Sequence, residues 1–249
     1  MKKLILAVLM TVAAVALMAG GYSVAYASGE YLVVDGLGSY VLGSGFEVYD
    51  KPVIQMEAGK NFENGLGGSV WASLPTNFNN VGDNAATEVD LSVWYSKNFW
   101  TIGGAYYLMS PGTLTSTNND VLQVNAEVSK AFSLGIITAI PGFRVEYNFP
   151  VDDVHNSQTT GLYLIPMVDL ACNITDKLKV NMKTKLDVDM GGYGAEKALI
   201  IKVAPRMTYQ LSEKLSANVG IDMYFPTFMD DTDYREDLYV THAGISCAF

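Results

Sequence analysis

The clearest pattern in the chain is a strict alternation of apolar and polar residues over three consecutive runs between positions 177 and 226. In the first run every second position belongs to one mainly apolar set, namely Leu178, Val180, Met182, Thr184, Leu186 and Val188. The positions between them are polar or charged, namely Lys179, Asn181, Lys183, Lys185, Asp187 and Asp189. A repeat of two residues predicts β-strands with one apolar and one polar face, because a helix would repeat every 3.6 residues or so.

Similar runs extend this pattern over the rest of the chain. The predicted strands cover residues 37–46, 52–62, 66–74, 87–96, 100–109, 121–129, 137–148, 161–173, 178–189, 199–211, 215–226 and 237–249. Short turns near residues 63, 97, 132, 175 and 212 alternate with longer polar loops, as in an up-and-down meander that closes into a barrel. The prediction is an all-β, antiparallel transmembrane β-barrel of about twelve strands. Ten or fourteen strands stay open as alternatives, because the runs at 37–46 and 161–173 alternate weakly.

The start of the chain has the pattern of a secretory signal peptide. Lys2 and Lys3 precede an apolar stretch over residues 4–20, and a small-x-small cleavage site ends at Ala27. We therefore expect residues 1–27 to be removed after Sec-type export and residues 28–249 to form a single barrel.

The end of the chain indicates which strand face meets lipid. The last predicted strand alternates up to a terminal Phe249, which resembles the sorting signal read by the outer-membrane barrel assembly machinery. Together with the signal peptide, it favours a barrel in the bacterial outer membrane with its apolar face outward. The alternative is a soluble barrel with its apolar face inside and the lysines of run 178–189 on its outer surface.

Aromatic residues on the outward positions support the membrane prediction. They fall in two sets, Tyr95, Trp100, Tyr209 and Phe249 near the short turns and Tyr106, Tyr147, Phe225 and Tyr239 near the long loops. Two aromatic girdles around an apolar band are typical of barrels that cross a bilayer.

Several short segments resemble a known family. They are Asp-Lys-Pro-Val-Ile-Gln at 50–55, Gly-Ser-Val-Trp-Ala-Ser within 65–74, Thr-Glu-Val-Asp-Leu at 87–91 and the stretch from Tyr106-Tyr107 to Pro111-Gly112. These segments resemble the TorF-type porins, small outer-membrane proteins of Gram-negative bacteria, over residues 37–112. The chain departs from the family's aromatic and arginine-rich first strand, since it has Leu-Gly-Ser-Tyr-Val-Leu-Gly at 37–43. The resemblance implies a channel but names no substrate.

With the apolar face outward, the polar positions of the strands face the lumen. The charged residues expected to line the pore are Lys179, Lys183, Lys185, Lys202, Arg206, Arg144, Glu57, Glu88, Asp90, Glu127, Glu146 and Asp222. They predict a basic wall on the strands around 179–206 and an acidic wall on the strands from 57 to 127. One interpretation is an open pore with a transverse electric field, and the other is a narrow barrel that ion pairs close.

Other classes of function find little support in the sequence. A formal net charge of −10 argues against a nucleic-acid partner. No zinc set, P-loop or dinucleotide fingerprint is present, so we expect no enzyme, no catalytic residue, no metal and no cofactor. His242 occupies an inward-facing position of the last predicted strand and is interpreted as a lumenal histidine rather than a catalytic base. The acidic loop at 229–237 is interpreted as solvated, and Cys172 and Cys247 as small, unpaired residues.

The sequence therefore predicts an outer-membrane, porin-like channel for passive diffusion of small hydrophilic solutes or ions. The alternative is a closed barrel with a structural or surface-interaction role through its long extracellular loops. The expected partners are outer-membrane lipid and lipopolysaccharide, the barrel assembly machinery through the strand that ends at Phe249, and the small solutes or ions themselves.

Overall fold

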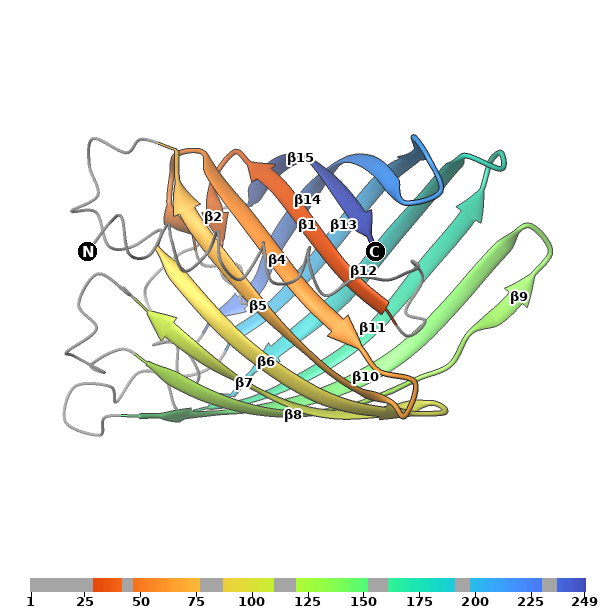
Figure 1. Cartoon of the computed structure of the whole chain (residues 1–249). Helices are drawn as coiled ribbons and strands as arrows, with labels where there is room; N and C mark the ends of the chain where they lie inside the picture. Colours follow the sequence, from red (N-terminus) through yellow and green to blue (C-terminus); the bar gives the residue numbers. More distant parts are fainter. Residues whose placement is uncertain are drawn as a thin grey trace.

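A computed structural model describes residues 29–41, 47–76, 87–109, 120–151, 161–190, 198–229 and 237–249, and these are almost entirely β-strand (Figure 1). The strands of the barrel wall are β1 (Gly29–Leu37), β4 (Val53–Asn61), β5 (Leu66–Pro75), β6 (Glu88–Lys97), β7 (Trp100–Met109), β8 (Val121–Ser129), β10 (Ile137–Pro150), β11 (Gly161–Asn173), β12 (Leu178–Asp189), β13 (Ala198–Gln210), β14 (Leu215–Met229) and β15 (Leu238–Ala248). No helix among these residues is long and apolar enough to cross a membrane.

Each wall strand pairs antiparallel with its neighbour in the chain, and the last strand returns to the first. The pairing of β10 with β11 joins the two arms of the sheet, while Val34 on β1 lies opposite Ile245 on β15. The described residues thus form a closed, twelve-stranded, up-and-down barrel, as the alternation predicts. Three short strands lie outside this wall: β9 (Phe132–Leu134) pairs with β10 alone, and β2 (Tyr40–Val41) pairs with β3 (Glu47–Tyr49) between β1 and β4.

The predicted position of the first strand is wrong. Of residues 37–46 only Leu37 belongs to a wall strand, as the last residue of β1; Tyr40–Val41 form the short strand β2, and residues 42–46 lie outside the described residues. The first strand is β1, which precedes it and pairs with both β4 and β15. The physical reason is composition: Tyr31-Leu32-Val33-Val34 is rich in β-formers, whereas the predicted segment contains three glycines. The other weak prediction, at 161–173, is confirmed as β11. The predicted signal peptide lies outside the described residues.

Strand lengths divide the barrel into two halves. Strands β1, β4, β5, β6, β7 and β8 have 9 or 10 residues each, and we call them the short-strand half. Strands β10 to β15 have 11 to 15 residues each and form the long-strand half. Because a strand rises about 3.3 Å per residue, the wall of the long-strand half reaches farther. Figure 1 shows β9 and β10 projecting beyond the turns that join β4 to β5 and β6 to β7.

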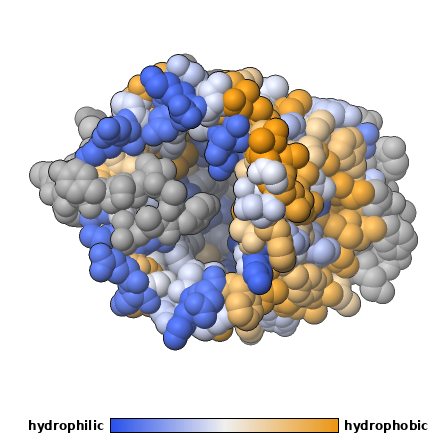
Figure 2. Space-filling model, turned by 90° about the vertical axis from the view of Figure 1, so that its right-hand side faces the viewer, coloured by the Kyte–Doolittle hydropathy of each residue, from blue (hydrophilic) through white to orange (hydrophobic). Residues whose placement is uncertain are grey.

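The outer face of the barrel is apolar in both halves. Many large apolar side chains there are exposed, including Leu91, Ile102, Leu122, Val124, Val128, Phe143, Met182, Met207, Val219 and Ile245. Figure 2 shows hydrophobic residues gathered on the outer flank and hydrophilic residues around a hollow at the end of the barrel. Exposed apolar surface of this extent is unfavourable in water and expected against lipid.

Aromatic contacts mark both edges of this apolar band. Near the short turns, the rings of Tyr95 and Trp100 lie 5.6 Å apart, centroid to centroid. Near the long loops, the rings of Phe225 and Tyr239 lie 6.1 Å apart, edge to face. Cys172 and Cys247 are both free thiols, as the sequence predicts.

Candidate functional site

The inner face of the barrel encloses two cavities that meet. The turn-side cavity, toward the short turns, has a volume of about 980 Å³, and the loop-side cavity, toward the long loops, about 600 Å³. Six residues line both, namely Tyr107, Gln123, Arg144, Met167, Asp169 and Lys183. The two cavities are therefore parts of one lumen, and these six residues form the junction between them.

Ten of the twelve residues expected along the pore line one of these cavities. Glu57 and Glu127 line the turn-side cavity, and Arg144 and Lys183 line both. The loop-side cavity is lined by the remaining six, namely Glu88, Asp90, Glu146, Lys185, Lys202 and Arg206. Asp222 is buried behind this lining and Lys179, near a short turn, lines neither cavity. That these residues line an open pore stays a prediction.

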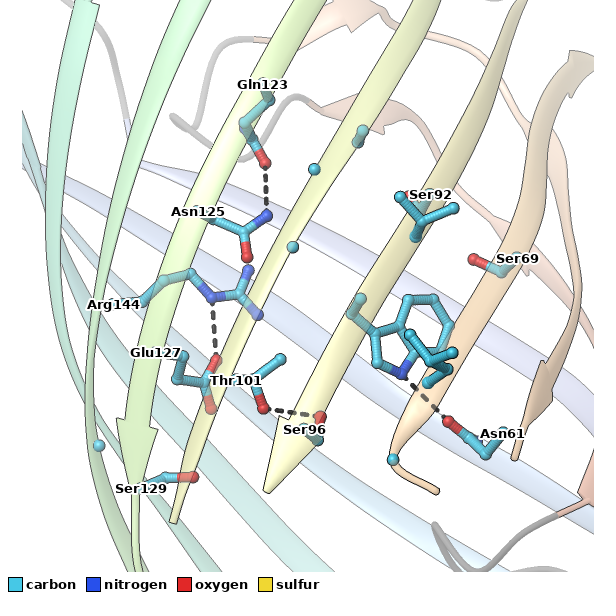
Figure 3. A pocket seen from close by; sticks show the side chains of 18 of the residues that line it. Asn61, Ser69, Ser92, Ser96, Thr101, Gln123, Asn125, Glu127, Ser129 and Arg144 are labelled. Carbon is cyan, nitrogen blue, oxygen red and sulfur yellow. Dashed lines mark hydrogen bonds and ion pairs between the residues drawn. The ribbon is translucent and has the colours of Figure 1, made fainter. Parts of the chain in front are cut away.

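Arg144 at the junction is held by two carboxylates. Its Nε lies 2.9 Å from Glu127 Oε2 and its Nη1 lies 2.9 Å from Glu146 Oε1. Gln123 extends this network by donating from Nε2 to Glu146 and to Asn148, at 3.3 and 3.1 Å. Figure 3 shows Arg144 reaching across to Glu127, with Gln123 and Asn125 farther along the neighbouring strand. Two charge-assisted hydrogen bonds fix the guanidinium in place at the point where the cavities join.

Three basic residues of the long-strand half are paired with acidic residues of the same half. Lys185 and Lys202 lie directly opposite each other on β12 and β13, which would be unfavourable without compensation. Lys185 Nζ lies 2.8 Å from Asp187 Oδ2, and Lys202 Nζ lies 2.6 Å from Asp222 Oδ2. Arg206 also lies 3.6 Å from Asp222. These charges are consequently arranged in pairs.

Lys183 differs from the other basic residues of the lumen. Within the described residues it makes no ion pair, although Asp169 is its direct partner across β11 and β12. It lines both cavities, so its ammonium group stands at the junction beside Arg144.

In the acidic wall of the short-strand half, Glu127 is paired with Arg144 but Glu57 and Asp90 lack such compensation in the described part of the chain. Its strand register places Glu57, Trp71, Asp90 and Tyr107 side by side on β4, β5, β6 and β7. Glu57 accepts a hydrogen bond of 2.8 Å from the Tyr31 hydroxyl, and neither Glu57 nor Asp90 makes an ion pair within the described residues. The two walls therefore differ: Glu57 and Asp90 have no basic partner among the residues that the structure describes, whereas Lys185, Lys202 and Arg206 are each paired with an acidic residue.

His242 is buried in the long-strand half, as its inward-facing position in the alternating last strand predicts. Its Nε2 lies 3.7 Å from Asp222 Oδ1, in the same cluster as Lys202 and Arg206. The acidic loop of the sequence analysis lies outside the described residues except for its ends.

Sequence reasoning missed the uncharged part of the lumen. Tyr31, Asn61, Trp94, Tyr107, Gln123 and Asn125 all line the turn-side cavity. The alternation pattern puts the last five on the inner face, but the residues predicted to line the pore were only the charged ones. Tyr31 could not have been found in this way because its strand was not predicted.

Comparison with known structures identifies the fold. The KdgM porin in complex with disordered oligogalacturonate matches with a TM-score of 0.52 and 8% identity, over 88% of this chain and 99% of that one. The NanC porin matches with a TM-score of 0.53 and 15% identity, over 88% and 98%. The β domain of the Bordetella autotransporter BrkA matches with a TM-score of 0.52 and 11% identity, over 89% and 100%. No family model and no curated protein matches the chain.

The chain therefore has the fold of the outer-membrane β-barrels. At these identities the likeness establishes the fold alone, and the fold serves both porins and an autotransporter domain. The resemblance to the TorF-type porins stays a prediction.

Proposed function

We propose that the protein is an outer-membrane channel for the passive diffusion of small hydrophilic solutes or ions. The observation that carries this proposal is the contrast between the two faces of one wall. The outer face is apolar along its length, while the inner face is polar and encloses two joined cavities of about 980 and 600 Å³. A plugged structural barrel has no need of such a lumen. The KdgM porin, which shares the fold, was solved with an oligosaccharide.

The junction of the cavities is the selective part of this channel. Arg144 and Lys183 project into it from the long-strand half, and Tyr107 and Gln123 from the short-strand half. Across the lumen as a whole, eight lining carboxylates face five lining basic groups: Glu57, Glu63, Glu88, Asp90, Glu127, Glu146, Asp169 and Asp187 against Arg144, Lys183, Lys185, Lys202 and Arg206. Fixed charges in a narrow pore set the concentration of mobile ions, so the channel prefers cations.

The chain reaches this membrane through Sec-type export with removal of residues 1–27. The barrel assembly machinery then recognises the last strand, which ends at Phe249, and the outer face contacts membrane lipid and lipopolysaccharide. Phe249 donates its backbone N–H to the Glu30 carbonyl at 3.0 Å, so the terminal residue also closes the seam between β15 and β1.

Single-channel recording of the refolded barrel in a planar bilayer tests the proposal. With a salt gradient across the membrane, we expect reproducible current steps and a reversal potential whose sign indicates a preference for cations. A barrel that is folded, as shown by heat-modifiable mobility in electrophoresis, but electrically silent would contradict it.

The second candidate is a closed barrel that acts through its long extracellular loops. The ion pairs at the junction favour this alternative, because Arg144, Glu127 and Glu146 form a network that spans β8 and β10. Replacing Arg144 with Ala separates the candidates. A silent barrel that gains conductance on this change would be closed by the network, whereas a channel that already conducts changes only its ion preference.

A further inference from the structure

Two aromatic rings lie flat on the inner wall of the short-strand half. Tyr31 on β1 is directly opposite Gly59 on β4, and Trp94 on β6 is directly opposite Gly67 on β5. A side-chain carbon on Gly59 would collide with the Tyr31 ring, and one on Gly67 would collide with the Trp94 indole. Each ring therefore covers glycine backbone with one face, and because both residues line the turn-side cavity, the other face is turned to the lumen.

The wall beside these rings is recessed. Directly paired positions cross the sheet from Tyr31 through Gly59, Ser69, Ser92 and Ala105 to Gln123. The four residues between the tyrosine and the glutamine are small, so this row leaves room that larger side chains fill elsewhere. The room belongs to the turn-side cavity, whose volume of about 980 Å³ is at the upper end of the range for small-molecule sites.

Uncharged polar groups surround the rings. The Trp94 indole donates from Nε1 to Asn61 Oδ1 at 3.2 Å, which fixes the plane of the ring. Asn125 and Gln123 carry amides on β8, and Ser96 and Thr101 share a hydrogen bond of 2.8 Å between hydroxyls. Figure 3 shows these side chains, together with Ser69 and Ser92, on neighbouring strands of the same wall. Amides and hydroxyls can both donate and accept, so they suit a solute whose own groups do the same.

The charged groups nearest these rings are bound to other groups. Glu57 holds the Tyr31 hydroxyl, and Glu127 is bound to Arg144. An ionic ligand would have to break these contacts, whereas an uncharged ligand would leave them in place. Lys183 and Asp169 lie at the junction with the loop-side cavity. The part of the turn-side cavity beside the rings therefore fits a neutral solute better than an anion or an organic cation.

We propose that the turn-side cavity is a weak binding subsite for a neutral polyhydroxylated ring, that is, a sugar. The C–H face of the ring would lie on the exposed faces of Trp94 and Tyr31, and its hydroxyls would bond to the surrounding amides and hydroxyls. This inference rests on the proposed channel and names a class of solute for it. Weak binding is what a channel requires, because a solute must both enter and leave.

Tryptophan emission tests the subsite without recourse to conductance. The chain has three tryptophans, so a protein with Trp71→Phe and Trp100→Phe keeps Trp94 as its single reporter. We expect glucose and maltose to shift its emission with half-saturation on the order of 10 mM. The matched control carries Trp94→Phe and Trp100→Phe and keeps Trp71, which lines the loop-side cavity instead; its emission should not respond. Glycerol at the same osmolarity should leave both proteins unchanged, because it has no ring face to stack.

Channel recording then separates this inference from the proposed function. In wild-type channels we expect maltose to reduce the ion current about twofold at saturation, and Trp94→Ala to abolish this block while Trp71→Ala retains it. Current steps that no sugar alters, with no shift in Trp94 emission, would overturn the subsite and leave the channel standing. A silent folded barrel whose Trp94 emission still responds to sugar would overturn the channel and support the subsite. A larger response to tetramethylammonium or glucuronate than to glucose would overturn the assignment to a neutral ring.

Discussion

The two halves of the barrel share one outer surface but have different inner ones. The short-strand half lines the lumen with small residues, flat aromatic rings and carboxylates without a basic partner among the described residues, such as Asp90. The long-strand half lines it with basic side chains that are paired with acidic residues of neighbouring positions, such as Lys202 with Asp222. Every strand must present an apolar outer face to lipid, whereas no single requirement applies to all the residues that face the lumen. The inner face is therefore where the chain could acquire a specific function.

Charges placed on the lipid face should give the largest effect and should not distinguish the halves. Leu91→Arg in the short-strand half and Met182→Arg in the long-strand half each replace an exposed outer side chain. We expect each to lower the free energy of unfolding by about 3 kcal/mol near the centre of the bilayer. Urea unfolding in lipid vesicles measures this, with the inward Ser92→Arg as the control that should cost much less. Equal costs for Leu91→Arg and Ser92→Arg would contradict the assignment of the faces.

Removing one carboxylate from each half should distinguish them. Asp222→Asn takes the acidic partner away from the half-buried Lys202 ammonium group, which keeps its hydrogen bond to the Tyr224 hydroxyl. We expect a loss of about 2 kcal/mol in the free energy of unfolding, less than for a fully dry ion pair because the lumen is wet. The matched change Asp90→Asn removes a carboxylate that makes no ion pair within the described residues, and should be neutral or stabilising. The comparison fails if Asp90→Asn proves the more costly of the two.

Reversing charges on the two walls should move the reversal potential in opposite directions. Lys183→Glu with Lys202→Glu should raise the preference for cations, by about threefold in the permeability ratio. Glu57→Lys with Asp90→Lys should lower it by a similar factor. Both are read from single-channel currents under a salt gradient. An unchanged reversal potential in the variant with Lys183→Glu and Lys202→Glu would show that the long-strand half does not line the pore.

A single methyl group on the inner wall should give the smallest effect. Gly67→Ala would collide with the Trp94 indole, whereas Gly142→Ala in the long-strand half would meet its nearest neighbours, Ser129 Cβ and the Val128 carbonyl oxygen, only at 3.2 Å. We expect the first to cost about 1 kcal/mol in unfolding free energy and the second about half as much. The first should also weaken the sugar-dependent shift of Trp94 emission, and a shift of wild-type size would show that the ring does not rest on the glycine.

The alternation of residues was sufficient to predict most of the barrel. Eleven of the twelve wall strands, the short turns between them and the two aromatic edges follow from a repeat of two and from turn residues. The missed strand, β1, has only nine residues and lies just after the predicted signal peptide, so its short alternating run is not distinguished from a connecting segment. Ten of the twelve charged residues expected inside line a cavity because parity alone decides on which face of a strand a residue lies.

The amino-acid pattern therefore decides local features: which residues form strands, and which face of each strand is apolar. Which residues meet across the lumen depends on register, and register is a relation between strands that no single run contains. The folded barrel alone establishes that Lys202 pairs with Asp222, that Arg144 bridges Glu127 and Glu146, and that Trp94 rests on Gly67. The proposed selectivity and the proposed sugar subsite both arise at that level, because each depends on side chains from several strands.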